Sequence, residues 1–369
     1  MKILADAHIP YLKGVAEQFG EVEYLPGNQF TRDTIREKDA LIVRTVTHFD
    51  EEILSGTKVK LICSATIGFD HIDTAWCDTH GIAWRTAPGC NAASVEQYVT
   101  ACLLYLSKIH QFKLNKKTIG IVGVGNVGGK VEVACKKLGM RVLLNDPPRE
   151  EQEGSALFTD IETIQREADI ITFHTPLIKV GQYKTYHLAD DHFLASVERR
   201  PFIINAARGA ITDNQALKKA IYNGNIAGVV IDCWENEPEI DRELLQLADI
   251  ATPHIAGYSA DGKWTATKMS LENLNKFFNL NIKSPHYQEI PSPPKSIINL
   301  QDIDPEQQLQ HAIWHTYDPM TETAALKSSP EKFYWFRSNY PLRREYPAYT
   351  VLGSNNRILP IFLSLGFQG

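Results

Sequence analysis

The stretch TIGIVGVGNVGG, residues 118–129, constrains the fold of this chain more than any other feature. It sets the pattern Gly123-x-Gly125-x-x-Gly128 between an apolar run and a helical pattern. In a dinucleotide-binding unit, the first glycine permits a tight turn and the second lets the backbone approach a pyrophosphate, while the third lets helix and strand pack closely. The pattern therefore predicts a strand, a phosphate-binding turn and a helix.

The residue that ends the next apolar run, Asp146 in VLLND, indicates which dinucleotide binds. A carboxylate there can accept hydrogen bonds from ribose hydroxyls and would repel a 2′-phosphate, so we expect NAD rather than NADP. The alternative is an ordinary strand–turn–helix without a ligand, and the agreement of all parts of the pattern disfavours it. The NAD contacts predicted in this region are Gly123, Gly125, Asn126, Val127, Gly128 and Asp146.

Composition limits the class of protein. The 369 residues exceed what one hydrophobic core usually serves, so two or three domains are expected. The net charge of −6, without a long basic run, disfavours nucleic-acid binding. The six cysteines are scattered without a C-x-x-C pair, which is typical of reduced thiols in a cytoplasmic enzyme, and no metal-ligand spacing occurs. No signal peptide is expected, because the N-terminal stretch MKILADAHIP carries Asp6 within its apolar segment. No membrane helix is expected, because no apolar run approaches the roughly 18 residues that one requires.

Apolar runs alternate with helical patterns along most of the chain, which predicts parallel sheets covered on both faces. The expected class is α/β, with two Rossmann-like doubly wound parallel-sheet domains and a small C-terminal α/β domain. Residues 9–20 are expected to form a helix, and Ser94 with Gln97 is expected to be the capping box that starts a long helix. A proline-rich linker lies at 281–296. The predicted domains are 1–94 with 257–284, 95–256 and 285–369.

Polar residues follow three of the predicted strands. Arg208 follows IINAA, Glu235 and Glu237 follow VVID, and His254 follows IATP. They should converge, because ligands bind at the carboxyl ends of the strands in a doubly wound sheet. A histidine can take a proton near neutral pH, a carboxylate can orient its ring, and an arginine can hold a substrate carboxylate, which together suit the oxidation of a 2-hydroxy acid. A buried core histidine is the alternative for His254, and Glu235 is expected to be a solvated neighbour of Glu237.

These residues carry a resemblance to a known family. The segments GIVGVGNVGG, ITFHTPL, INAARGAITD, DCWENEP and TPHIAG resemble those of the D-isomer-specific 2-hydroxyacid dehydrogenases, over roughly residues 40 to 260. The resemblance implies an NAD-dependent oxidoreductase in which Arg208, Glu237 and His254 are catalytic, with a hydride passing from C2 to NAD and a proton to His254. It also implies NAD contacts at Thr175, Ala206, Ala207, Arg208, Asp232 and Gly257.

Other segments resemble a narrower group of this family, which oxidises a phosphorylated 2-hydroxy acid during pyridoxal 5′-phosphate synthesis. They include LIVRTVTHFD, SATIGFDHID, PHIAGYSADGK and FRSNYPLRREYPAYTV. This resemblance implies a homodimer that forms through the C-terminal domain, and an active-site cleft between the first two domains. The resemblance implies substrate contacts at Thr45, Thr66 and Tyr258. The implied substrate is an anion at both ends, so its phosphate needs a cation other than Arg208, and the candidates are Arg44, Arg343 and Arg344.

Several alternatives stay open at this point. The neighbours Arg343 and Arg344 could hold the substrate phosphate, but a solvated surface pair or a dimer salt bridge explains them equally well. Tyr258 could donate its hydroxyl to the substrate or only cover the cleft. The alternative functions are another D-2-hydroxyacid dehydrogenase, such as a phosphoglycerate dehydrogenase, and a non-enzymatic NAD-sensing regulator on the same fold.

Overall fold

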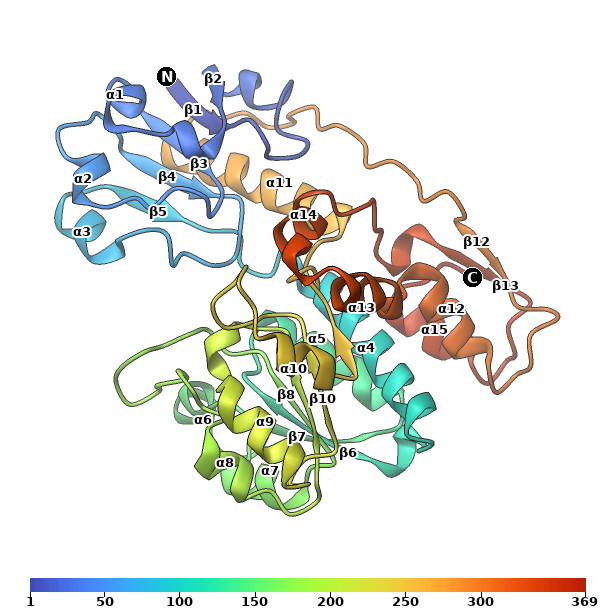
Figure 1. Cartoon of the computed structure of the whole chain (residues 1–369). Helices are drawn as coiled ribbons and strands as arrows, with labels where there is room; N and C mark the ends of the chain where they lie inside the picture. Colours follow the sequence, from blue (N-terminus) through green and yellow to red (C-terminus); the bar gives the residue numbers. More distant parts are fainter. The chain divides into compact units, whose positions relative to one another are not determined.

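The computed structural model describes residues 1–369, which form two compact units (Figure 1). The first unit comprises Met1–Asn91 and Ser259–Pro291, and the second comprises Ala92–Tyr258 and Ser292–Gly369. Each unit is built around its own parallel sheet, which confirms the predicted α/β class with two doubly wound sheets. No helix combines the length and the apolar character that crossing a membrane would require.

The first unit holds a five-stranded parallel sheet in the order β2-β1-β3-β4-β5. One face packs against α11 and the segment that follows β1, and the other packs against α1, α2 and α3, so the central strands are buried on both sides. The strands are β1 Lys2–Asp6, β2 Glu21–Leu25, β3 Ala40–Val43, β4 Leu61–Ser64 and β5 Ala83–Arg85. The helices are α1 Arg32–Ile35, α2 Glu51–Leu54, α3 Thr74–Thr79 and α11 Ala260–Phe277.

The helix expected over residues 9–20 is wrong, because only one 3₁₀ turn, Ala16–Gln18, forms there. Tyr11 and Gly14 have φ angles of +61° and +88°, in the left-handed region, and Pro10 has no amide hydrogen to donate. The apolar residues of this segment are nevertheless buried against the sheet. The apolar spacing thus indicated burial correctly but not the conformation of the backbone.

The second unit holds a six-stranded parallel sheet in the order β11-β10-β9-β8-β6-β7. The strand order reverses at β6, because the chain passes from β6 to β7 on one side and then to β8 on the other. Ligands of such sheets bind at the carboxyl ends of the strands beside this reversal. The strands are β6 Thr118–Val122, β7 Arg141–Asn145, β8 Ile170–Phe173, β9 Phe202–Asn205, β10 Gly228–Ile231 and β11 Ile250–Ala251.

Helices cover both faces of this sheet. The long helix α4 and the helix α5 pack on one face, and α7, α8, α9 and α10 pack on the other. The helices are α4 Ala92–Ile109, α5 Asn126–Lys137, α6 Pro147–Glu153, α7 Ile161–Glu167, α8 Asp191–Ala195, α9 Asn214–Tyr222 and α10 Arg242–Leu247.

The capping box expected at the start of α4 is wrong. The helix begins at Ala92, so Ser94 and Gln97 lie inside it. Ser94 Oγ donates a hydrogen bond to the Ala256 carbonyl over 2.8 Å, and Gln97 Nε2 donates to Thr316 Oγ1 over 3.0 Å. Ser94 and Gln97 therefore form hydrogen bonds with residues that are distant in the sequence, and they do not cap the helix.

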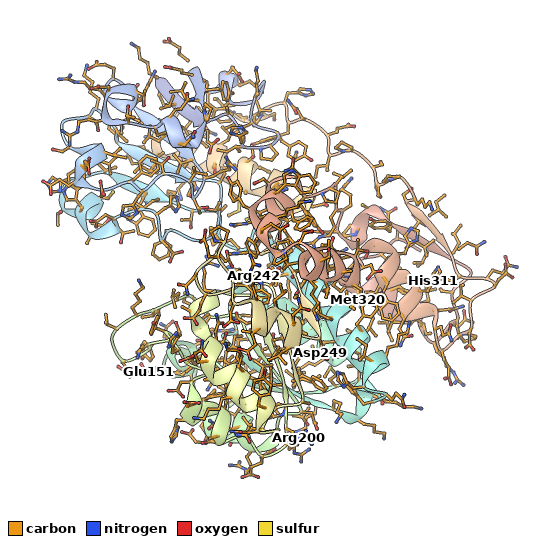
Figure 2. The ribbon with its side chains drawn as sticks, in the orientation of Figure 1. Glu151, Arg200, Arg242, Asp249, His311 and Met320 are labelled. Carbon is orange, nitrogen blue, oxygen red and sulfur yellow. The ribbon has the colours of Figure 1, made fainter.

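The C-terminal residues 292–369 belong to the same compact unit as the six-stranded sheet. Two of their helices pack on α4, and α13 also covers the edge strand β11, whose Ala251 amide donates to Thr323 Oγ1 over 3.1 Å. Figure 2 labels Met320 in α13 and Asp249 just before β11. Strands β12 and β13 pair in parallel. A separate domain at 285–369 stays a prediction. The elements are β12 Ile297–Asn299, α12 Gln308–Thr316, α13 Pro319–Ser328, α14 Phe333–Ser338, β13 Thr350–Leu352 and α15 Leu359–Leu365.

Candidate active site

Two glycines of the turn that follows β6, Gly123 and Gly128, are too tightly packed for a side chain. Gly123 has a φ of +87°, and a Cβ there would lie 2.8 Å from the backbone nitrogen of Thr175, which follows the neighbouring strand β8. A Cβ on Gly128 would overlap the carbonyl oxygen of Gly123. The close approach of β6, β8 and α5 therefore explains why both positions are glycine.

The N-terminus of α5 fits a pyrophosphate. A Cβ on Gly125 would meet no atom within 4 Å, and no side chain caps the helix. The amides of the first turn, at Asn126 and Val127, can therefore donate to an anion. Across the turn, Thr175 Oγ1 is buried and has no hydrogen-bond partner in the protein, as expected of a hydroxyl that contacts a ligand. These residues fit the predicted NAD.

Asp146 is held rigidly at the end of β7, where it caps α6. Its Oδ2 accepts a hydrogen bond from the Val124 amide over 2.8 Å, and its Oδ1 accepts one from the Arg149 amide over 3.2 Å. A carboxylate has further acceptor capacity beyond these two bonds. The position therefore suits the predicted contact with ribose hydroxyls.

His254 and Glu237 form a hydrogen-bonded pair. His254 Nδ1 donates to Glu237 Oε2 over 2.7 Å, and the other oxygen, Oε1, accepts from the Trp234 amide over 2.7 Å. Burial alone would raise the pKa of Glu237, but His254 and these hydrogen bonds bring it below its usual value. The carboxylate therefore orients the ring and leaves Nε2 for proton transfer.

Arg208 shares a cavity of about 330 Å³ with this pair. It follows β9, and its Nη1 donates to the Ala207 carbonyl over 2.8 Å. A Cβ on Gly209 would overlap the backbone of Trp234, so the turns after β9 and β10 lie in direct contact. This contact brings Arg208 near Glu237 and His254, as predicted from the strand ends. The cavity is also lined by Lys179, Tyr186 and Glu235.

Asp232 organises the backbone beside His254. Its carboxylate is buried and accepts from Thr252 Oγ1 over 2.7 Å, from the Ile255 amide over 2.8 Å and from the Ala256 amide over 3.0 Å. These bonds hold the turn that leads to Gly257. Sequence reasoning missed this bracing role, and the predicted contacts of Asp232, Gly257 and Ala206 with NAD stay predictions.

The expectation that Glu235 is a solvated neighbour of Glu237 is wrong. Its Oε1 lies 2.6 Å from His187 Nε2, and its Oε2 accepts from the Asn214 amide over 3.1 Å. His187 also lies 3.4 Å from Asp213. Glu235 thus ties the loop before α8 to the start of α9, and no sequence signal marked His187 for this contact.

Arg343 is not free to bind a substrate phosphate, because it is only 4% exposed. Its guanidinium donates to Ser94 Oγ and to the Ala256 carbonyl. The idea that the adjacent arginines reach the phosphate together is therefore wrong for this residue. The carbonyl of Arg344 accepts from Gln97, and the role of its side chain stays a prediction.

Three of the predicted substrate contacts belong to the first unit. Arg44 and Thr45 follow β3, and Thr66 follows β4, so all three lie at the carboxyl edge of that sheet. Arg44 forms a two-point pair with Asp6, through bonds of 2.9 and 3.2 Å. Thr66 Oγ1 donates to the Gly68 carbonyl over 3.1 Å. Their contact with substrate stays a prediction.

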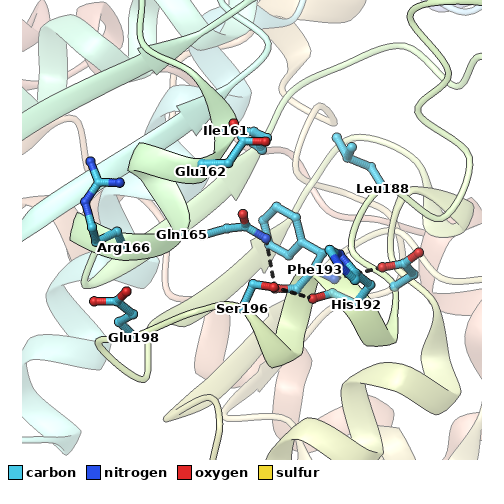
Figure 3. A pocket seen from close by; sticks show the side chains of 10 residues that line it. Ile161, Glu162, Gln165, Arg166, Leu188, His192, Phe193, Ser196 and Glu198 are labelled. Atoms are coloured by element: carbon cyan, nitrogen blue, oxygen red, sulfur yellow. Dashed lines mark hydrogen bonds between the residues drawn. The ribbon is translucent and has the colours of Figure 1, made fainter.

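A larger cavity of about 470 Å³ lies between α7 and α8 (Figure 3). Gln165 Nε2 crosses it to donate to the Phe193 carbonyl over 3.1 Å, and Ser196 Oγ donates to the His192 carbonyl over 2.9 Å. It contains none of the predicted catalytic or cofactor residues. We therefore assign the chemistry to the smaller cavity, where an arginine converges with a carboxylate–histidine pair.

Comparison with known proteins agrees with this geometry. A family model described as "D-isomer specific 2-hydroxyacid dehydrogenase, NAD binding domain" matches residues 93–256. A domain of unknown function matches residues 290–366. The solved D-lactate dehydrogenase of Aquifex aeolicus, in complex with NAD and lactic acid, has a TM-score of 0.64 at 22% identity. That match covers 79% of this chain and all of the other chain, and it supports the fold alone.

Similar curated proteins match along nearly the whole chain. The erythronate-4-phosphate dehydrogenase of Bacteroides thetaiotaomicron is 52% identical, over 96% of this chain and 99% of its own length. The protein of the same name from Porphyromonas gingivalis is 45% identical, over the full length of both chains. The matched part therefore includes the C-terminal residues as well as both sheets.

Proposed function

This chain belongs to the erythronate-4-phosphate dehydrogenases of the D-isomer-specific 2-hydroxyacid dehydrogenase family, and we propose that it oxidises 4-phospho-D-erythronate with NAD. The product is (R)-3-hydroxy-2-oxo-4-phosphooxybutanoate. The observation that carries the proposal is the His254–Glu237 pair in one cavity with Arg208. The identity of about half of all residues over the whole chain favours this reaction over the two alternative functions.

In this mechanism, Arg208 binds the substrate carboxylate through its fork of donors. His254 Nε2 takes the proton of the C2 hydroxyl, while Glu237 stabilises the imidazolium through Nδ1. Bound NAD supplies the acceptor for the hydride that leaves C2. Gly125, Asn126 and Val127 would hold its pyrophosphate.

The phosphate end of the substrate needs a second cation, because Arg208 is used at the carboxylate. We assign this role to Arg44 or Arg344, of which Arg44 already balances Asp6. We assign Thr45, Thr66 and Tyr258 to the substrate hydroxyls. The variants Arg44→Ala and Arg344→Ala distinguish these two assignments. Only removal of the arginine that binds the phosphate should raise the KM for the phosphorylated substrate.

We further propose a cytoplasmic homodimer that acts in pyridoxal 5′-phosphate synthesis. The support for dimerisation is a set of exposed apolar side chains in the C-terminal segment. Light scattering of the purified protein at micromolar concentration checks the oligomeric state, and a monomer would contradict this part of the proposal. The exposed side chains are Ile297, Tyr334, Trp335, Leu342, Leu352 and Leu363.

The decisive experiment is turnover of 4-phospho-D-erythronate, followed by NADH absorbance with an acceptor supplied to recycle bound cofactor. 3-Phosphoglycerate serves as the competing substrate. We expect the first compound to be oxidised with the higher kcat/KM, and the reverse order would favour a phosphoglycerate dehydrogenase. Turnover of neither compound, with NADH binding intact, would favour an NAD sensor.

A His254→Ala variant tests the catalytic assignment. It should lose about 100-fold or more in kcat and keep its affinity for NADH, because the loss concerns proton transfer alone. Near-normal turnover of this variant would refute the role of His254.

A further inference from the structure

Two arginines of the C-terminal segment hold the backbone and side chains that follow His254. Arg343 is buried, and its guanidinium donates to the Ala256 carbonyl and to Ser94 Oγ. Ser94 Oγ also donates to the Ala256 carbonyl, over 2.8 Å. Arg343 thus binds the backbone of Ala256, which lies 87 positions away in the sequence and two residues beyond the proposed catalytic His254.

The surroundings of Arg343 show that this contact is costly to build. The guanidinium carbon lies 4.5 Å from the ring centre of Tyr317 and 5.7 Å from that of Tyr340. Burial of a guanidinium without a directly bonded carboxylate costs free energy, which the ring contacts and the carbonyl acceptor offset in part. The donors of Arg343 point at Ser94 Oγ and at the Ala256 carbonyl, so the buried charge acts on the geometry of this segment.

The second arginine, Arg337 in α14, contacts Tyr258. Its guanidinium carbon lies 5.4 Å from the ring centre of Tyr258, and it is a hydrogen-bond partner of the same side chain. Tyr340 meets the ring of Tyr258 edge-on, with the centres 6.2 Å apart. The Nε of Arg337 is buried without a partner, and the charge of Arg337 also acts on Glu237. Tyr258 is therefore held between two side chains of the C-terminal segment.

We propose that the C-terminal segment 292–369 completes the active site of its own chain, with Arg337 and Arg343 as positioning residues for His254–Tyr258. Arg337 orients the Tyr258 side chain toward the substrate, and Arg343 fixes the backbone through Ala256. This role rests on the proposed function for its catalytic consequence, and it is additional to dimerisation. Loss of these contacts should therefore lower turnover even when the homodimer stays intact.

A double-mutant cycle tests the part played by Arg337. The variants are Arg337→Met, Tyr258→Leu and the two combined, with Arg357→Met as a control at an exposed arginine of the same segment. We expect Arg337→Met to lower kcat/KM about 10-fold or more, mainly through KM, with unchanged NADH affinity. In the Tyr258→Leu background the same change should cost less than about 2-fold, because the residues act together. Arg337→Lys should recover part of the loss, and additive effects would overturn the proposal.

Hydrogen exchange tests Arg343 without any need for turnover. The amides of His254, Ile255 and Ala256 all donate to Asp232, so their exchange reports opening of this segment. Arg343→Met should speed their exchange at least about 10-fold relative to Arg357→Met, and Arg343→Lys should do so less. Unchanged exchange in both variants would overturn the proposal. A wild-type protein without turnover would refute the proposed function but leave this readout intact.

Discussion

The glycine turn permits a prediction that separates packing from cofactor binding. Gly123→Ala would place a Cβ 2.8 Å from the Thr175 nitrogen and 2.8 Å from the His174 carbonyl carbon, where ordinary contacts begin at 3.4 Å. Both neighbours are backbone atoms, so neither can rotate away. The φ of +87° adds the penalty of a left-handed conformation for a residue with a Cβ. In Gly125→Ala, by contrast, the added Cβ meets nothing within 4 Å.

The magnitudes of the two changes differ accordingly. The left-handed conformation costs about 1–2 kcal/mol and the overpacking about 1–3 kcal/mol, so Gly123→Ala should destabilise the protein by about 2–5 kcal/mol. Gly125→Ala should change the free energy of unfolding by less than about 0.5 kcal/mol, as expected for an open surface site. It should nevertheless weaken NADH binding about 10-fold or more, because its Cβ occupies the approach of the pyrophosphate.

Thermal denaturation and NADH fluorescence titration measure the two effects separately. A domain of this size loses about 2–4 °C in Tm per kcal/mol, so Gly123→Ala should melt well below the wild type and Gly125→Ala should melt with it. The reasoning would be refuted by a Gly125→Ala variant with wild-type NADH affinity. It would also be refuted if the two variants had equal Tm values.

Three further predictions follow from charges in the second unit. Glu237→Gln should lower kcat about 100-fold with unchanged NADH affinity, because His254 loses the carboxylate that stabilises its protonated ring; an unchanged kcat in steady-state assays would exclude this role. Asp146→Asn keeps the helix-capping oxygen but removes the charge, so the ratio of NAD to NADP affinity should fall about 10-fold in paired titrations, and an unaltered ratio would contradict the assignment. Burial raises the pKa of Glu96 to about 8 from 4.5, so the native state retains a proton that the unfolded state releases, and stability falls as the pH rises between these values. Glu96→Gln should therefore have a higher Tm than the wild type at pH 8.5 and a similar one at pH 4.5. Between these pH values, the stability of the variant relative to the wild type should rise by about 1.4 kcal/mol per pH unit. A Tm difference independent of pH would contradict the shift.

Part of this protein follows from its sequence alone. The glycines at 123 and 128 specify a tight turn, because Gly123 has a positive φ and a Cβ on Gly128 would overlap the Gly123 carbonyl oxygen, and both requirements are local. Arg208, Glu237 and His254 could be assigned to one edge because each follows a buried strand, and parallel strands share that edge. The pairing of His254 with Glu237 was predictable for the same reason.

Other features depend on contacts that no local pattern encodes. The apolar spacing of residues 9–20 is compatible with a helix. The backbone of Tyr11 and Gly14 instead adopts left-handed φ angles, which a right-handed helix excludes. The local pattern predicts Ser94 as a helix cap. In the structure Ser94 instead bonds to Ala256 and Arg343, which come from distant parts of the chain. The contact of Arg337 with Tyr258 forms only when α14 packs against the rest of the second unit. Sequence periodicity thus determines which residues are buried and where strands end, whereas the partners of each buried polar group depend on how separate segments pack in three dimensions.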